Sequence, residues 1–193
     1  MIHFHIISCE QRSDVLKETL QELKDSINIE PKIFITPRHD QQSPAENQCV
    51  NEMISFAHAR KTMQPEDWLL RLEDDVRPTR KIEPVIAKLI EIPEIEIFNL
   101  GNLQTPFMGV KDINGYQLRQ MIVPVLGTQA MLLSYSTVQQ LARFVIGLPM
   151  ENSFYFPLQG RFLQLANPVL FEHKTYPSVA YPNRASSFST ISS

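Results

Sequence analysis

The first hundred residues alternate between short apolar segments rich in β-forming residues and segments whose apolar positions recur with a helical period. Four strand-like segments lie near residues 2–8, 32–36, 67–72 and 95–100, and three helix-like segments separate them. Parallel strands need a crossover connection, usually a helix, so this alternation favours a mostly parallel sheet with helices packed on it. The chain is therefore predicted to be an α/β protein.

The helices between these strands are predicted from capping residues and apolar spacing. Ser13 is expected to cap the first helix, whose apolar residues Leu16, Leu20 and Leu23 fall on one face. A second helix is expected to begin at residues 43–46, where a capping serine is followed by proline and then by glutamate three residues after the cap. Each helix thus follows a strand closely enough to pack back onto it.

The second half of the chain is less regular. We expect a loop at residues 112–115 and a helix at about 137–146. From residue 176 the sequence is rich in Ser, Pro and Asn and has no periodic apolar pattern. The prediction is one domain over residues 1–175, in which a regular α/β half joins a mixed half, followed by a flexible tail or lid at 176–193.

Composition narrows the class of protein further. A chain of 193 residues that is 43% hydrophobic can bury a sizeable core. The net charge of −3 gives no general attraction for phosphate backbones, so nucleic acid is not an expected partner, although a nucleic acid acceptor is not excluded. Apolar segments are well short of the roughly 20 residues that span a bilayer. We expect a cytoplasmic protein with no membrane span, in which Cys9 and Cys49 are free thiols.

The most informative motif is the acidic turn, Glu73-Asp74-Asp75, which directly follows an apolar strand. Open α/β sheets bind ligands at the carboxyl ends of their strands, and the turn is expected there, at an exposed edge. Adjacent carboxylates repel one another unless a cation or basic side chains offset the charge, and hard divalent cations prefer oxygen ligands. The motif predicts a metal site, and the alternative is a solvated turn paired with Arg71, Arg77 or Arg80.

The same region carries a family resemblance. Residues 68–78, a strand followed by Glu-Asp-Asp and then Val-x-Pro, resemble the signature of nucleotide-sugar glycosyltransferases of the GT-A fold. In particular they look like the family of lipooligosaccharide β-galactosyltransferases and collagen galactosyltransferases. Residues 6–12 are similar to that family's first strand and Arg-containing loop. Residues 127–134 look like its Gly-Thr-x-Ala-Tyr-x-x-Ser block, with Met131 where an aromatic is usual.

The resemblance implies a single GT-A-like domain, with a nucleotide-binding half at 1–101 and an acceptor half at 102–175. The implied activity is that of a metal-dependent glycosyltransferase that moves a hexose from a nucleotide sugar, expected to be a UDP-sugar, to an acceptor hydroxyl. A Mn²⁺ or Mg²⁺ ion would neutralise the leaving diphosphate without needing a proton. Asp74 and Asp75 are the expected ligands, and His173 is a further candidate whose alternative is a surface or capping histidine.

The resemblance also implies donor-binding and catalytic residues. Ser8 and Arg12 in the first loop would contact the donor, Glu73 would face the sheet or the ribose, and Arg184 would contact the diphosphate from the tail. An inverting transfer needs a base for the acceptor hydroxyl, and the candidates are two carboxylates, Glu151 and Glu172. The alternatives are a non-catalytic nucleotide-binding or interaction protein of the same fold and a metal-dependent phosphohydrolase. The donor sugar and the acceptor stay open.

Overall fold

The computed structural model of the chain describes residues 1–35, 37, 44–93, 95–101, 107–121, 129–143, 161 and 163–174. Within these residues the strands form an eight-stranded sheet of order β2-β1-β3-β8-β5-β9-β7-β6 and a two-stranded sheet, β10-β4. β1 pairs in parallel with both β2 and β3, whereas β8 lies antiparallel between β3 and β5. The predicted α/β class is confirmed, with a parallel first part and a mixed second part.

The first half of the chain contains the predicted strands and helices in the predicted order, together with a 3₁₀ turn and a short strand, β4, that were not predicted. Their bounds are β1 Ile2–Ile7, the 3₁₀ turn η1 Glu10–Arg12, α1 Ser13–Leu23, β2 Lys32–Phe34, α2 Pro44–Thr62, β3 Trp68–Glu73, β4 Val76–Pro78, α3 Glu83–Leu89 and β5 Ile97–Asn99. One detail of the prediction is wrong: Ser13 is already helical, and Arg12 takes the N-cap position without a side-chain cap hydrogen bond.

The second half adds an antiparallel hairpin and a return to the sheet. Its elements are β6 Phe107–Ile113, β7 Tyr116–Met121, β8 Ala130–Ser134, α4 Tyr135–Leu141, β9 Leu163–Asn167 and β10 Phe171–His173. The loop expected at 112–115 is the turn of the β6–β7 hairpin, with Asn114 at φ 54° and Gly115 at φ 82°. Two successive positive φ values fit a two-residue hairpin turn, for which Asn-Gly is a favoured sequence.

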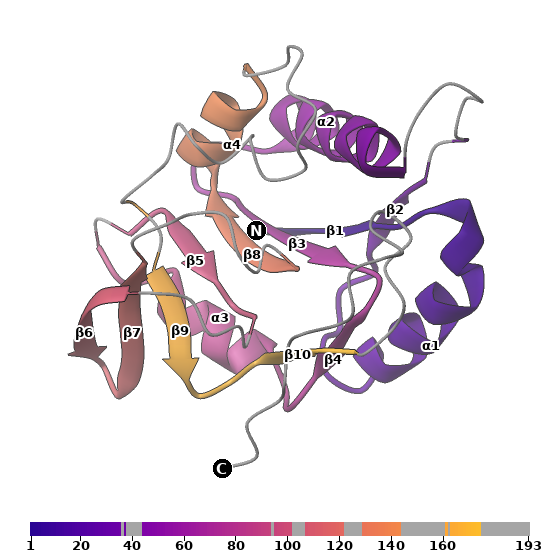
Figure 1. The fold of residues 1–193 in the computed structure, drawn as a ribbon. Helices are drawn as coiled ribbons and strands as arrows, with labels where there is room; N and C mark the ends of the chain where they lie inside the picture. The colour runs from indigo at the N-terminus through magenta and orange to yellow at the C-terminus, as the bar shows by residue number, and fades with distance from the viewer. Residues whose placement is uncertain are drawn as a thin grey trace.

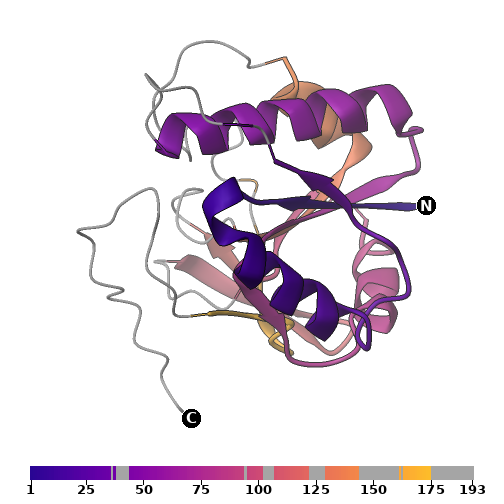
Figure 2. The ribbon, with the colours of Figure 1, turned by 90° about the vertical axis from the view of Figure 1, so that its right-hand side faces the viewer.

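Helices cover both faces of the large sheet. Figures 1 and 2 show α2 and α4 together on one face and α1 and α3 on the other, with the small β4–β10 sheet beside α1. Two buried clusters match these layers: Leu16 of α1 and Leu89 of α3 belong to one, and Phe56 of α2 and Leu141 of α4 belong to the other. Adjacent strand residues point to opposite faces, so Leu69 joins the second cluster and Leu70 the first.

Two predictions about the chain as a whole can be compared with this fold. Cys9 and Cys49 are free thiols, as predicted. No helix in the described part of the chain is long and apolar enough to cross a membrane.

Candidate active site

The acidic turn lies at the carboxyl end of β3, where the sequence predicts it. β3 ends at Glu73, which pairs in parallel with Ile7 at the end of β1, so Ser8 and Asp74 follow neighbouring strands at one edge of the sheet. The chain then continues into β4, which the sequence did not predict. Because β4 pairs with β10 in an antiparallel register that places His173 opposite Val76, the histidine is brought next to the turn from 98 residues away.

Two residues of the β1–α1 loop contact the aspartates. Ser8 Oγ donates a hydrogen bond of 2.5 Å to Asp74 Oδ2. Arg12 Nη1 lies 3.0 Å from Asp74 Oδ1, and Arg12 Nη2 lies 2.7 Å from Asp75 Oδ2. One guanidinium therefore bridges both carboxylates, in the charge-assisted geometry that is the strongest class of protein hydrogen bond.

His173 completes this group from β10. Its Nε2 lies 3.2 Å from Asp75 Oδ2, the oxygen that also accepts from Arg12. Asp75 Oδ1 is buried and has no hydrogen-bond partner among the residues that the structure describes. The structure thus brings together five of the predicted site residues, namely Ser8, Arg12, Asp74, Asp75 and His173.

The carboxylates are buried, so the expectation of an exposed edge is wrong. Asp74 and Asp75 have 2% and 5% of their surface exposed. Burial raises the pKa of Asp74 to about 6, although the Arg12 charge and the Ser8 hydrogen bond act in the opposite direction. Burial also opposes ionisation of Asp75, but its hydrogen bond with His173 and the charge of Arg12 outweigh it, so the pKa of Asp75 lies below its ordinary value. The Asp75 hydrogen bond in turn raises the pKa of His173.

Glu73 forms an ion pair with Arg71, which lies two residues earlier on the same strand. Arg71 Nη1 donates to Glu73 Oε1 at 3.1 Å, and Arg71 Nη2 forms a second ion pair with Glu52 of α2. Arg71 is fully buried, and Glu52 is 1% exposed. The predicted alternative, in which Arg71, Arg77 or Arg80 neutralises the acidic turn, is thus met only at Glu73, since Arg77 pairs with Glu22 of α1.

The remaining predicted residues are not brought to this group. Glu172 is exposed and stands opposite Arg77 in the β4–β10 pairing. Adjacent residues of a strand point to opposite faces, so Glu172 faces away from the side that carries His173. Glu151 and Arg184 lie outside the described residues, as does the tail or lid predicted at 176–193.

Sequence reasoning missed the buried polar contacts of the helices that support this edge. Asn51 of α2 donates to the Ser8 carbonyl at 2.9 Å, and Ser55 lies 2.8 Å from His5 Nδ1. Asn51 thus supports the residue that follows β1, and Ser55 supports His5 within β1, which gives His5 a structural role. The spacing of Asn51 and Ser55 by four residues places them on one face of α2, and this polar face is the signal that could have revealed the contacts.

The side chains of the site offer oxygen and nitrogen ligands that suit a divalent cation. Two carboxylates and an imidazole are ligands that Mn²⁺ accepts, and the buried Asp75 Oδ1, which forms no hydrogen bond with a described residue, offers one ligand oxygen. With Arg12 bound to the carboxylates, these ligand groups do not yet surround one point. Within the described residues, no three His, Cys, Asp or Glu side chains have the arrangement of a metal site. A divalent cation would share the carboxylate oxygens of Asp74 and Asp75 with Arg12 or displace Arg12 from them.

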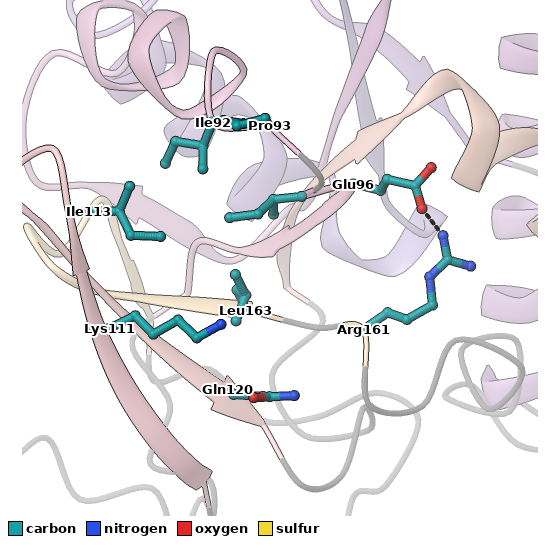
Figure 3. Close-up of a pocket in the computed structure, with 9 residues that line it drawn as sticks. Ile92, Pro93, Glu96, Lys111, Ile113, Gln120, Arg161 and Leu163 are labelled. Carbon is teal, nitrogen blue, oxygen red and sulfur yellow. Dashed lines mark ion pairs between the residues drawn. The ribbon is translucent and has the colours of Figure 1, made fainter.

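A hollow of about 410 Å³ lies elsewhere, between the α3–β5 connection and the β6–β7 hairpin. Figure 3 shows Lys111 and Gln120 on one side and the Glu96–Arg161 ion pair on the other, with Leu163 between them. Glu96 precedes β5, so the hollow is at the amino end of a strand that runs parallel to β3, opposite the edge that carries the acidic turn. It contains one carboxylate, already paired with Arg161, and does not resemble a metal or diphosphate site.

Comparisons with solved structures give several matches, which include glycosyltransferases and a cytidylyltransferase. A glycosyltransferase involved in the glycosylation of the major capsid of PBCV-1 has a TM-score of 0.53 at 15% identity, covering 93% of this chain and 96% of that one. A Drosophila β1,4-galactosyltransferase 7 mutant, in complex with manganese, UDP-Gal and xylobiose, has a TM-score of 0.50 at 11% identity, covering 90% and 71%. A cytidylyltransferase from Leptospira borgpetersenii has a TM-score of 0.51 at 14% identity, covering 87% and 76%.

These similarities establish the fold. No protein-family profile matches the chain, and a comparison with curated protein sequences finds no match. The predicted GT-A fold is confirmed, since the chain covers nearly the whole of the viral glycosyltransferase. The cytidylyltransferase match means that the fold alone does not separate glycosyl from nucleotidyl transfer.

Proposed function

We propose that the chain is a glycosyltransferase that binds a nucleotide sugar at the carboxyl edge of β1 and β3 and transfers its sugar to an acceptor hydroxyl. The observation that carries the proposal is the set of contacts that joins Asp74, Asp75, Arg12 and His173 at this edge of a GT-A sheet. Burial of two carboxylates next to a guanidinium and an imidazole reduces the stability of the fold, because charged groups lose their hydration. Functional sites are where such perturbed carboxylates gather.

The proposed donor is a UDP-sugar with a hexose, and the proposed cofactor is Mn²⁺ or Mg²⁺ held by Asp74, Asp75 and His173. When bound, the ion supplies positive charge to the departing nucleoside diphosphate. Manganese and UDP-Gal in the structurally similar galactosyltransferase complex support this choice.

The protein's own residues would orient the donor. The Arg12 guanidinium is the cationic side chain nearest the carboxylates and can donate to a diphosphate through the same N–H groups that now contact Asp74 and Asp75. Ser8 would keep Asp74 in place through its 2.5 Å hydrogen bond. Glu73, paired with Arg71, would support this edge of the sheet. Of the two candidate bases for the acceptor hydroxyl, Glu151 is the one proposed, because Glu172 faces away from the side that carries His173.

The test is a binding screen followed by a turnover assay with the full chain. Thermal shifts are measured with UDP, GDP, CMP and their sugars, each with and without Mn²⁺, because a ligand that binds only the folded state raises its stability. The proposal expects a nucleotide-specific, Mn²⁺-dependent shift and release of nucleoside diphosphate from a nucleotide sugar.

Other outcomes identify the alternatives. Stabilisation without donor turnover would indicate a non-catalytic nucleotide-binding protein, and phosphate release from simple esters would indicate a phosphohydrolase. Pyrophosphate release from CTP and a sugar phosphate would indicate nucleotidyl transfer, the activity named for the Leptospira structure. Each of these results contradicts glycosyl transfer.

A further inference from the structure

Helix α1 contacts the acidic turn through a buried threonine. Thr19, in the middle of α1, is fully buried, and its Oγ1 donates a 2.5 Å hydrogen bond to the main-chain carbonyl of Asp74. A threonine inside a helix commonly returns its hydroxyl to a carbonyl of its own preceding turn. The Thr19 hydroxyl instead donates to a different segment, at Asp74 in the acidic turn.

Lys174 joins the same helix to the next residue of the turn. Its backbone N–H donates to the Asp75 carbonyl at 2.7 Å, and its Nζ donates to Thr19 Oγ1 at 3.2 Å. The ammonium also forms ion pairs with Glu22 at 2.7 Å and with Glu18 at 3.1 Å, while only 4% of its side chain is exposed. One buried lysine therefore contacts α1 and the acidic turn together.

The main-chain carbonyls of Asp74 and Asp75 are therefore both held, the first by α1 itself and the second by Lys174, whose side chain contacts α1. With Asp74 and Asp75 fixed in this way, their carboxylates are presented to Arg12 and His173. His173 directly precedes Lys174, so holding Lys174 on α1 also fixes the segment that carries the imidazole. Metal and diphosphate sites depend on such supporting contacts to keep their ligands in place.

We propose that Thr19 and Lys174, the carbonyl clamp, are positioning residues for the cation- and diphosphate-binding carboxylates. The inference rests on the proposed function, because it assigns the clamp a role in the affinity of that site. Neither residue would touch the donor. Both act through the main chain of Asp74 and Asp75.

The sign of one effect separates positioning from simple electrostatics. Lys174 is a positive charge near the acidic turn, so its charge alone disfavours a bound cation, and Lys174→Met would then strengthen Mn²⁺ binding. A clamp predicts the opposite. The variant keeps the main-chain N–H that donates to Asp75 but loses the ammonium that holds this segment on α1, so the carboxylates can move away from their binding geometry. Weaker Mn²⁺ binding in Lys174→Met is therefore the expected result.

Thr19→Val is the cleaner variant, since it removes the hydroxyl while keeping the branched shape and the charge. Thr19→Ser restores a hydroxyl and should recover the wild-type behaviour. The matched control is Thr137→Val in α4, because Thr137 is also fully buried and its Oγ1 lies 3.4 Å from the Glu96 carbonyl, away from the acidic turn.

Two quantities are measured on the full chain. The first is the affinity for Mn²⁺ in the presence of UDP, from the electron paramagnetic resonance signal of free Mn²⁺. The second is the rate of hydrogen exchange, without metal, at the amides of residues 74–76 and 174. Thr19→Val should weaken Mn²⁺ binding by about tenfold or more and speed exchange at these amides. Thr19→Ser and Thr137→Val should match the wild type in both readouts.

The outcomes are distinguishable. If the wild type binds Mn²⁺ and UDP but Thr19→Val binds Mn²⁺ equally well, or if exchange at the turn is unchanged, the clamp is overturned and the proposed function stands. If the wild type binds neither Mn²⁺ nor UDP, the proposed function is overturned, and the role of the clamp toward a metal fails with it. Tighter Mn²⁺ binding by Lys174→Met would also overturn the clamp.

Discussion

Arg12 Nη2 lies 2.7 Å from Asp75 Oδ2, across 63 residues of sequence, and the same guanidinium reaches Asp74. A protein cation thus already occupies the carboxylate oxygens that a divalent cation would use. Removing one partner of such a buried ion pair leaves the other charge uncompensated. Arg12 can therefore stabilise the metal-free site and, once a diphosphate is present, donate to that anion instead.

Replacement of Arg12 should separate cation binding from nucleotide binding. Arg12→Met is expected to weaken UDP binding by about 1.5–3 kcal/mol, because a charge-assisted hydrogen bond to the diphosphate is lost. Mn²⁺ binding without nucleotide should become tighter, since the competing guanidinium is gone. Isothermal titration calorimetry measures both affinities.

Arg77→Met serves as the control, because Arg77 is a half-exposed arginine that pairs with Glu22 and does not contact the aspartates. Its UDP and Mn²⁺ affinities should equal those of the wild type. An Arg12→Met protein that binds UDP as tightly as the wild type would contradict the role of Arg12 toward the donor.

Asp75→Asn should remove most Mn²⁺-dependent UDP binding, because the central carboxylate of the site loses its charge. Since Asp75 is buried and contacts Arg12 and His173, the variant should also lose stability, by about 1–3 kcal/mol. Asp112→Asn, at an exposed position of β6, is the control for charge alone. Calorimetry with UDP and Mn²⁺ measures the change in UDP affinity, and urea unfolding measures the loss of stability. Equal Mn²⁺-dependent UDP affinity in the wild type and Asp75→Asn would exclude the metal site.

Much of the fold could be predicted because its signals are local. The strands at 2–7 and 68–73 and helix α1 follow from apolar period and β-forming residues, and the acidic turn follows from its place after a strand. The turn could then be predicted to form a ligand site, because open α/β sheets bind ligands at the carboxyl ends of their strands.

The contacts within the site could not be predicted in the same way, because they join segments far apart in sequence. No local pattern reveals that β4 pairs with β10, and this pairing is what brings His173 to Asp75. Nor does any local pattern show that Lys174 is buried against Glu22 of α1. A hydrophilic residue in a short segment is expected at the surface, and only the tertiary structure supplies the opposite charges that allow its burial.

The buried arginine beneath the site should be one of the most sensitive positions for stability. Arg71→Met would leave Glu52 and Glu73 without their shared cation, and breaking a buried pair in this way costs about 3–5 kcal/mol. Arg77→Met removes the more exposed pair with Glu22 and should cost less than about 1 kcal/mol. Urea unfolding compares the two variants, and similar small losses would contradict the assigned role of Arg71.

His5 gives the protein a specific acid sensitivity. The side chain is 2% exposed, lies 2.8 Å from Ser55 Oγ and stacks with His58 at 5.5 Å. Burial, followed by the nearby charges of His58, His3 and Lys32, lowers the pKa of His5 to about 3. The imidazole therefore stays neutral in the folded chain over a pH range in which it is protonated in the unfolded chain.

The sign of the pH dependence follows from proton binding. Below the ordinary histidine pKa of about 6.5 the unfolded state binds a proton that the folded state excludes until about pH 3, so His5 reduces stability by about 1.4 kcal/mol for each unit of falling pH in this window. The variant His5→Gln lacks this proton and, between pH 7.5 and 4.5, should lose about 2–3 kcal/mol less stability than the wild type. Urea unfolding at the two pH values provides the measurement, because the wild type and the variant differ in no other titratable group. An equal loss of stability in wild type and variant would show that His5 is not the group responsible.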